Sequence, residues 1–218
     1  MAAVQQVGSK VVGQSSTGND DLLAADFSQP EAASELWTDT LDRLNGSVDI
    51  LINNAGIFDP NPLNDSDEVW RDNWVRTMQI NLTASAELCR LAVRHWQERG
   101  SPGRIINIAS RAAYRGDSPN HWHYAASKGG MVAMTKTIAR AYAKDDILAF
   151  AICPGFTMTG MAEDYLESRG GEQLLRDIPL GRVAQPEEIA EMARWCAQDA
   201  PASMTGAILD ANGASYVR

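Results

Sequence analysis

The sequence predicts an α/β fold in which helices cover a parallel β-sheet. Three short apolar runs, at residues 48–53, 104–109 and 147–152, have the length and composition of strands that are buried on both faces. Longer segments with a helical spacing of apolar residues separate these runs, and strands that alternate with helices pair in parallel through crossover connections. At 218 residues the chain has the length of one domain, so we expect residues 1–218 to form a single domain.

The other elements follow in chain order from similar patterns. A strand is expected at 22–25, and Ser28-Gln-Pro-Glu31 has the pattern of a capping box with proline in the first turn, which predicts a helix. The remaining expected elements are a long helix at 71–99, a helix at 124–144, a helix that opens at Pro186 and a last strand at 205–209.

Charge and composition argue against several classes of protein. The formal net charge is -9 and the basic residues are scattered singly, so neither nucleic acid nor an anionic membrane surface is an expected partner. No apolar run approaches the ~20 residues of a membrane span and the start lacks a signal-peptide pattern, which predicts a cytoplasmic protein. No metal site is predicted, and we expect buried, reduced thiols at Cys89, Cys153 and Cys196.

Tyr124-Ala-Ala-Ser-Lys128 places a phenol and an ammonium four residues apart, on one face of a predicted helix. A free phenol titrates near ~10, and a neighbouring cation favours the phenolate and lowers that pKa. The pair therefore has the chemistry of a general acid and base. The same spacing also occurs in solvated surface pairs, so the surrounding motifs must decide between the two interpretations.

Several motifs stand in one order around this pair. Asn53-Asn-Ala-Gly56 follows a strand, Asn81 lies in a long helix, Ser110 ends a strand and Pro154-Gly155-Phe-Thr-Met-Thr159 ends the next one. With Tyr124 and Lys128, this series resembles the short-chain dehydrogenase/reductase family, most closely its members similar to 3-oxoacyl-carrier-protein reductase. The resemblance covers about residues 9–218 and implies a Rossmann-like, three-layer, doubly wound parallel sheet.

The resemblance also implies a role for each catalytic residue. Tyr124 would be the general acid that protonates a carbonyl oxygen, and the base in the reverse direction. Lys128 would lower the pKa of Tyr124 and bind the nicotinamide ribose, and Ser110 would donate a hydrogen bond to the substrate oxygen. Asn81 would anchor a water in a proton relay to Lys128. The plainer alternatives are a strand-end hydroxyl for Ser110 and an amide that bonds its own backbone for Asn81.

The cofactor implied by the resemblance is NADP or NAD. Gln14-Ser-Ser-Thr17, at the end of the expected second strand, carries neither an acidic residue for a ribose hydroxyl nor an arginine for a 2′-phosphate, so the two remain undistinguished. An ordinary turn or loop is the alternative at each of the positions that match the family's cofactor contacts. Besides Tyr124 and Lys128, these are Asp26, Phe27, Asn53, Ala55, Gly56, Pro154, Gly155, Thr157 and Thr159.

The first strand of the family and its glycine-rich turn have no counterpart in this sequence. Gly8, Gly13 and Gly18 have the wrong spacing for a phosphate-binding loop, and no apolar run precedes them. Either the given sequence starts downstream of the true start, or the chain is truly shortened and binds dinucleotide poorly. We favour the first explanation because the acid and base residues are intact.

The leading hypothesis is an NAD(P)-dependent oxidoreductase that interconverts a ketone and a secondary alcohol. The rival is a catalytically silent relative that serves as an assembly or interaction subunit. The resemblance implies a homodimer or homotetramer that pairs through the helices at 71–99 and 124–144. A segment at 155–171 is either a lid over the substrate or a short core-packing helix, and the residues expected to surround the substrate are Arg111, His121, His123, Met158, Met161 and Tyr165.

Overall fold

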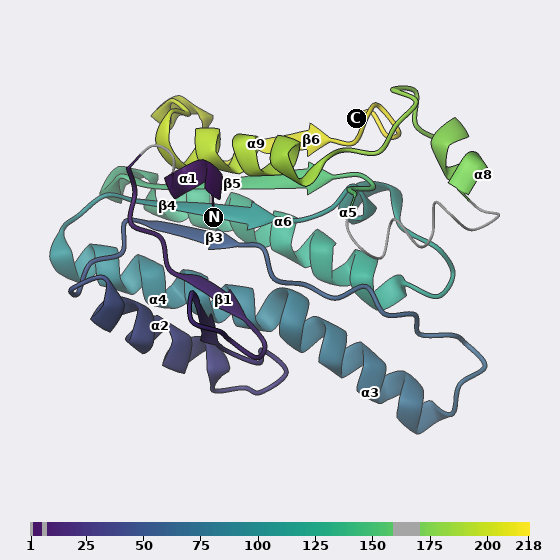
Figure 1. The fold of residues 1–218 in the computed structure, drawn as a ribbon, viewed down its shortest axis with the longest axis horizontal. Coiled ribbons are helices and arrows are strands. Elements are labelled where there is room, and N and C mark those ends of the chain that lie inside the picture. Colours follow the sequence, from purple (N-terminus) through teal and green to yellow (C-terminus); the bar gives the residue numbers. More distant parts are fainter. Residues whose placement is uncertain (1, 6–7, 159–170) are drawn as a thin grey trace.

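The main element of the structure is a parallel sheet with strand order β3-β4-β5-β6 (Figure 1). This computed structural model describes residues 2–5, 8–158 and 171–218. The strands are β3 (Ile50–Asn53), β4 (Gly103–Ile108), β5 (Ile147–Pro154) and β6 (Ile208–Ala211), and each pairs with its neighbour in parallel. The predicted α/β class is confirmed.

A separate pair of parallel strands, β1 (Gly13–Ser15) and β2 (Leu22–Ala24), completes the described strands. These two strands form a sheet of their own, and among the described residues no strand pairs with the outer edge of β3. The first three residues of β3 are only half-buried. The expectation that this apolar run is buried on both faces was therefore wrong, whereas β5 is buried along its whole length.

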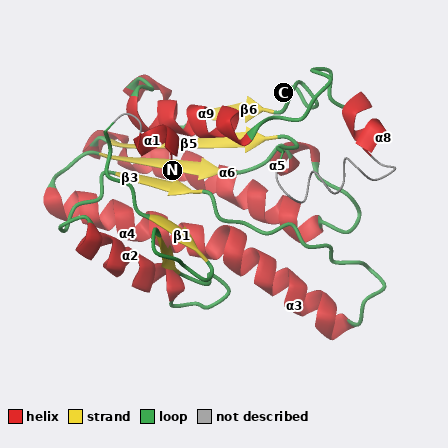
Figure 2. Ribbon diagram, viewed as in Figure 1, coloured by secondary structure: helices red, strands yellow, loops and turns green. Residues whose placement is uncertain are grey.

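The sheet lies between two helical layers, as Figure 2 shows. On one side are α2 (Ala32–Arg43), α4 (Ala84–Arg99) and α6 (Trp122–Tyr142), and on the other are α9 (Pro186–Gln198) and the short α1 (Ala2–Gln5). One apolar core joins α2 and α4 to the sheet, and a second joins α9 to the opposite face. This is the predicted three-layer arrangement.

The long helix expected at 71–99 is a run of three helical segments. It begins earlier than predicted, with α3 (Asp67–Met78), because the Ser66 hydroxyl accepts a hydrogen bond from Val69 N at 3.3 Å and caps the helix. A π-helical turn, η1 (Gln79–Thr83), joins α3 to α4. The helix ends as predicted at Gly100, which adopts the left-handed conformation with φ of 59°.

Two other sequence predictions were wrong in their boundaries. The capping box at Ser28 does not form, since the Asp26 carboxylate accepts a hydrogen bond from Ser28 N at 3.0 Å and α2 starts only at Ala32. The last strand starts at residue 208 and not at Thr205, because Gly206 has φ of 88° and turns the chain ahead of the strand.

The remaining described elements are short. They are α5 (Ala112–Arg115), η2 (Ala143–Asp145), α8 (Gly171–Arg176) and η3 (Ala202–Met204). None of the described helices is long and apolar enough to cross a membrane. The three cysteines are free and buried, as expected. Most of the segment considered as a lid lies outside the described residues, and so do Met161 and Tyr165.

Candidate active site

Three elements bring the predicted catalytic residues together. Ser110 follows the carboxyl end of β4, Asn81 lies in the π-helical turn, and Tyr124 and Lys128 occupy the first two turns of α6. Ser110, Asn81 and Lys128 are buried, and Tyr124 is half-buried. Figure 1 shows the N-terminal half of α6 beside α3 and the carboxyl ends of the strands. Ligands of open parallel sheets bind outside these strand ends.

The Lys128 ammonium is held inside this site. Its side chain is 4% exposed, and Nζ donates a hydrogen bond to the carbonyl of Ile108 at 2.9 Å. Burial lowers the pKa of Lys128 to about 8. Nζ also lies 5.8 Å from the centre of the Tyr124 ring. An ammonium has three donors and this one has a single acceptor among the described residues, so two N–H groups remain for a ligand.

Asn81 connects the loop after β3 to α6. Its amide bonds both backbone groups of Ile57, accepting from N at 2.8 Å and donating to O at 3.0 Å, and it donates to the Ser127 hydroxyl at 3.3 Å. Ser127 in turn donates to the carbonyl of Tyr124 at 2.7 Å. Ser127 was not among the predicted site residues, although its place one helical turn after Tyr124 was a signal for it.

Gly56 leaves space beside the candidate catalytic groups. A Cβ atom at this position would lie 3.3 Å from Asn81 Oδ1, closer than side chains normally approach, and 3.4 Å from Lys128 Nζ, at ordinary contact distance. A larger residue would therefore shift the Asn81 amide by a few tenths of an ångström. This close approach gives a physical reason for glycine in the Asn53–Gly56 motif.

The phenol of Tyr124 is not activated in the way that the sequence suggested. Burial raises its pKa, and hydrogen bonding from Ser110 only partly opposes this effect. Arg111 is the cation whose charge lowers the pKa of Tyr124, and it too only partly opposes burial. The raised pKa keeps the phenol protonated at neutral pH, which is the form that can donate a proton.

An aromatic group packs against Tyr124. The ring of Phe58 meets Tyr124 edge-on at 4.7 Å between centroids, and His121 stacks on Phe58 at 3.9 Å. No sequence motif pointed to Phe58. His123, which was expected with His121 around the substrate, is 1% exposed, and its ring lies between those of Trp74 at 6.4 Å and His121 at 6.3 Å between centroids.

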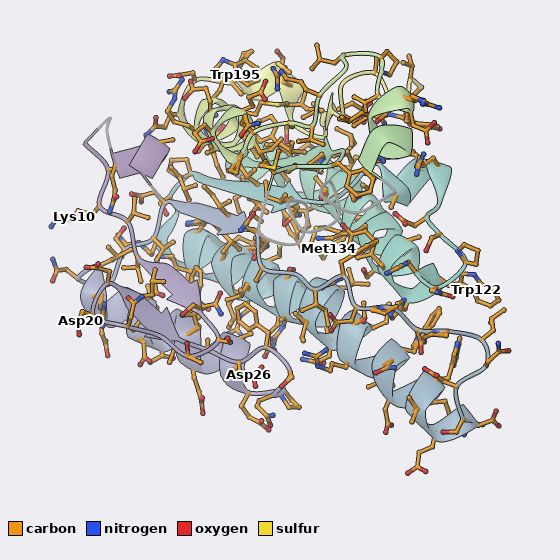
Figure 3. All side chains as sticks on the ribbon, turned by 45° about the vertical axis from the view of Figure 1, so that its right-hand side comes forward. Lys10, Asp20, Asp26, Trp122, Met134 and Trp195 are labelled. Atoms are coloured by element: carbon orange, nitrogen blue, oxygen red, sulfur yellow. The ribbon has the colours of Figure 1, made fainter. Side chains whose placement is uncertain are left out.

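Three of the predicted cofactor residues, Asp26, Phe27 and Asn53, differ in their exposure to solvent. The amide of Asn53 is committed to the protein interior, where Nδ2 donates to Asn107 Oδ1 at 2.9 Å and to Cys89 Sγ at 3.3 Å. The side chain of Phe27 is buried in the core beside α2. Asp26 is exposed in the turn after β2 (labelled in Figure 3), and the N–H of Ser28 lowers the pKa of its carboxyl.

The predicted residues after β5 form a tight turn beside the C-terminal segment. Pro154 O accepts a hydrogen bond from Arg111 N at 2.9 Å, and a Cβ atom on Gly155 would lie 2.9 Å from Asn212 Cα. The Thr157 hydroxyl donates to Gly155 O at 3.4 Å. Thr159 lies outside the described residues. Small residues thus keep the backbone of this turn close to its neighbours.

These residues fit one end of a dinucleotide. The two free N–H groups of buried Lys128 suit ribose hydroxyls, and the space beside Gly56 would be filled by a Cβ atom. No glycine-rich turn at a helix N-terminus, the usual site for a pyrophosphate, occurs before β3 in the described part of the chain. The observed fit is therefore to the nicotinamide ribose end.

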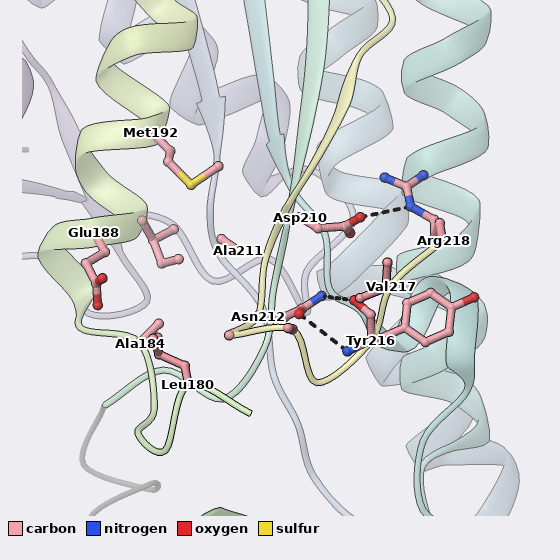
Figure 4. A pocket seen from close by; sticks show the side chains of 13 residues that line it. Leu180, Ala184, Glu188, Met192, Asp210, Ala211, Asn212, Tyr216, Val217 and Arg218 are labelled. Carbon is pink, nitrogen blue, oxygen red and sulfur yellow. Dashed lines mark hydrogen bonds and ion pairs between the residues drawn. The ribbon is translucent and has the colours of Figure 1, made fainter. Parts of the chain in front are cut away.

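A cavity of about 430 Å³ lies elsewhere, between α9 and the C-terminal segment (Figure 4). None of the four candidate catalytic residues lines it. Its charged residues are already paired, Asp210 with Arg218 at 3.0 Å and Glu188 with Arg182 at 2.6 Å. Paired charges offer no specific partner for a ligand, so this cavity is a weaker candidate than the site around Tyr124.

Comparison with known proteins identifies the family. A family model described as enoyl-(acyl carrier protein) reductase matches residues 3–213. The chain belongs to the short-chain dehydrogenase/reductase family. It is accordingly a short-chain dehydrogenase/reductase that acts on CH–OH/C=O groups with NADP or NAD as cofactor.

Individual relatives of this short-chain dehydrogenase/reductase cover most of its length. It is 37% identical to 3beta-hydroxysteroid dehydrogenase 1 of Eggerthella lenta over 88% of this chain and 72% of the relative. It is 34% identical to a 3-oxoacyl-[acyl-carrier-protein] reductase of Synechocystis over 97% of this chain and 88% of that relative. An NADP-bound structure of a candidate 2-deoxy-d-gluconate 3-dehydrogenase from Agrobacterium tumefaciens is 30% identical, with a TM-score of 0.80 over 90% of this chain and 76% of that one.

Proposed function

We propose that this protein interconverts a ketone and a secondary alcohol by Tyr/Lys/Ser acid-base catalysis. The observation that carries the proposal is that Ser110, Tyr124 and Lys128 lie together at the carboxyl end of β4. Asn81 holds α6 at this place through its hydrogen bond to Ser127. Relatives named for oxidising hydroxysteroids and reducing 3-oxoacyl groups support the same chemistry.

The roles follow from the chemistry of each group. In the reductive direction the Tyr124 phenol gives its proton to the carbonyl oxygen, and the Ser110 hydroxyl donates a hydrogen bond to the same oxygen. Bound NAD(P)H supplies the hydride that forms the new C–H bond. The Lys128 ammonium stabilises the phenolate left on Tyr124, and Asn81 holds the loop after β3 in place and orders a water that returns a proton through Lys128.

Further features of the proposal come from the resemblance to the family. We propose Asp26, Ala55, Gly56, Pro154, Gly155, Thr157 and Thr159 as cofactor contacts, the last two toward the nicotinamide and diphosphate. We also propose a cytoplasmic homodimer or homotetramer that pairs through α4 and α6. Light scattering would test the assembly, and a monomer across micromolar concentrations would contradict it.

Consumption of NADH or NADPH with a panel of ketones tests the enzymatic proposal. Tyr124→Phe should lower kcat/KM by about 10²- to 10⁴-fold, because it removes only the transferable proton. Cofactor affinity should stay the same, since the ring is retained. Equal activity of wild type and Tyr124→Phe on every reduced ketone would refute the proposed roles.

A second candidate function is a catalytically silent subunit, favoured by the unpaired outer edge of β3. Tryptophan fluorescence separates the two candidates because the chain has six tryptophans. Saturable quenching by NADPH or NADH would exclude the silent subunit. A flat titration with both cofactors would favour it.

A further inference from the structure

Arg111 is a buried charge beside the catalytic residues. It follows Ser110 directly and its side chain and backbone together are 6% exposed. Among the described residues its guanidinium makes one hydrogen bond, from Nη1 to the hydroxyl of Ser215. The guanidinium carbon also lies 5.0 Å from the centre of the Phe156 ring. Nε and Nη2 therefore have no hydrogen-bond partner in the described part of the chain.

None of the carboxylates in the described part of the chain neutralises this charge at close range. Arg111 belongs to none of the ion pairs formed by the described residues. Burial lowers its pKa, the positive charge of Arg115 adds to that effect, and Asp117 and Asp177 oppose it only from a distance. Arginine stays charged at neutral pH even so. Buried charges in proteins are normally paired or bind a ligand, so this one lacks the partner that burial requires.

The position of Arg111 connects it with the reaction. Its charge reaches the Tyr124 phenol, where it favours the phenolate. The Phe156 ring under its guanidinium belongs to the turn after β5, which carries the proposed nicotinamide contacts. A substrate whose carbonyl oxygen meets Ser110 and Tyr124 would therefore have another part of its structure near Arg111.

We propose that Arg111 binds a carboxylate carried by the substrate, so that the enzyme acts on keto acids and the corresponding hydroxy acids. This inference rests on the proposed function. The free Nε and Nη2 edge of a guanidinium matches the two oxygens of a carboxylate in a bidentate arrangement. The stack on Phe156 and the bond to Ser215 orient that edge. Arg111 is then a specificity residue, and proton transfer stays with Tyr124.

The test compares one ring ketone with and without a charge. Kinetics with NADPH or NADH are measured on 4-oxocyclohexanecarboxylate and on its methyl ester, for wild type and Arg111→Gln. Wild type should prefer the acid. The variant should lose about 10- to 100-fold more in kcat/KM for the acid than for the ester, as expected when a charge-assisted bidentate contact is removed. Arg111→Lys should recover part of the loss.

Two matched variants serve as controls. One removes a neighbouring charge, and the other removes the hydrogen bond that Arg111 makes within the protein. Arg115→Gln removes the same charge from an exposed neighbour and should leave the acid-to-ester ratio unchanged. Ser215→Ala keeps the guanidinium but removes the hydrogen bond that orients it, so it should lower kcat/KM for the acid by less than Arg111→Gln does and change the value for the ester little. In addition, cyclohexanecarboxylate should inhibit ester reduction by wild type at least about tenfold more strongly than cyclohexanecarboxamide.

The proposal would be overturned if wild type showed no preference for the acid, or if Arg111→Gln lowered both activities equally. A loss of acid preference in Arg115→Gln, or a larger loss in Ser215→Ala than in Arg111→Gln, would overturn it too. Failure of the proposed function has a different signature: no ketone, charged or neutral, is reduced, and Tyr124→Phe is indistinguishable from wild type.

Discussion

Replacement of Lys128 by methionine should make the protein more stable at neutral pH while it abolishes turnover. In the folded state burial lowers the pKa of Lys128 from 10.5 to about 8, a difference that corresponds to about 3 kcal/mol of cost for keeping the ammonium inside. Methionine removes that cost and fills a similar volume. It also removes the hydrogen bond to the Ile108 carbonyl, worth about 1 kcal/mol. The net expected gain is about 2 kcal/mol at pH 7.

The pH dependence identifies the cause of this gain. Between pH 8 and 10.5 the unfolded state holds a proton on Lys128 that the folded state has released, so this group makes wild type more stable as pH rises. Below pH 8 both states are protonated and the full cost remains. Urea unfolding followed by tryptophan fluorescence at pH 7, 8, 9 and 10 should show the advantage of Lys128→Met shrinking above pH 8.

An exposed lysine provides the control for this experiment. Lys144→Met, just beyond α6, should change the free energy of unfolding by no more than about 0.5 kcal/mol at any of these pH values. Our account of Lys128 as a desolvated ammonium fails if Lys128→Met is less stable than wild type at pH 7, with a difference that does not vary with pH.

Three further substitutions test packing and hydrogen bonding near the site, each by urea unfolding. Asn81→Ala should cost about 2–4 kcal/mol, because it leaves two backbone groups of the loop after β3 without partners; a loss below 1 kcal/mol would mean that the loop does not depend on this amide. Gly103→Ala should cost about 3 kcal/mol, since its Cβ would lie 2.1 Å from the buried ring of Trp96, and an unchanged midpoint would contradict this packing. Thr135→Val should cost about 1–3 kcal/mol because the buried amide of Asn107 loses its acceptor. Thr137→Val breaks only an exposed hydrogen bond within the same helix and should cost less. Equal losses in the two variants would contradict the importance of the bond to Asn107.

The sequence predicted the fold class and element order because these depend on local periodicity. It could not predict the partial burial of β3, since the run at 50–53 has the same apolar composition whether or not a strand pairs with its outer edge. The start of α2 was misplaced because two signals compete for Ser28 N, and the Asp26 carboxylate binds it ahead of any helix cap. Such competition is decided by geometry and not by residue type.

The candidate catalytic residues could be identified from motifs, but their environments could not. The spacing of Tyr124 and Lys128 predicted their shared helix face, yet burial raises the pKa of the phenol and lowers that of the ammonium. Phe58 carries no motif, and only the tertiary structure brings its ring to Tyr124. The unpaired state of Arg111 likewise depends on which carboxylates the fold leaves at a distance.

The π-helical turn at Gln79–Thr83 determines how far α3 is rotated about the helix axis relative to α4. An α-helix rotates by about 100° per residue, so the wider turn directs the faces of α3 and α4 differently from a regular helix. As a result α3 packs on α6, whereas α4 packs on α2 and on β4. Deleting one residue from this turn would swing α3 about the helix axis relative to α4 and carry Asn81 with it. A single extra residue in the backbone thus accompanies the placement of the Asn81 amide between Ile57 and Ser127.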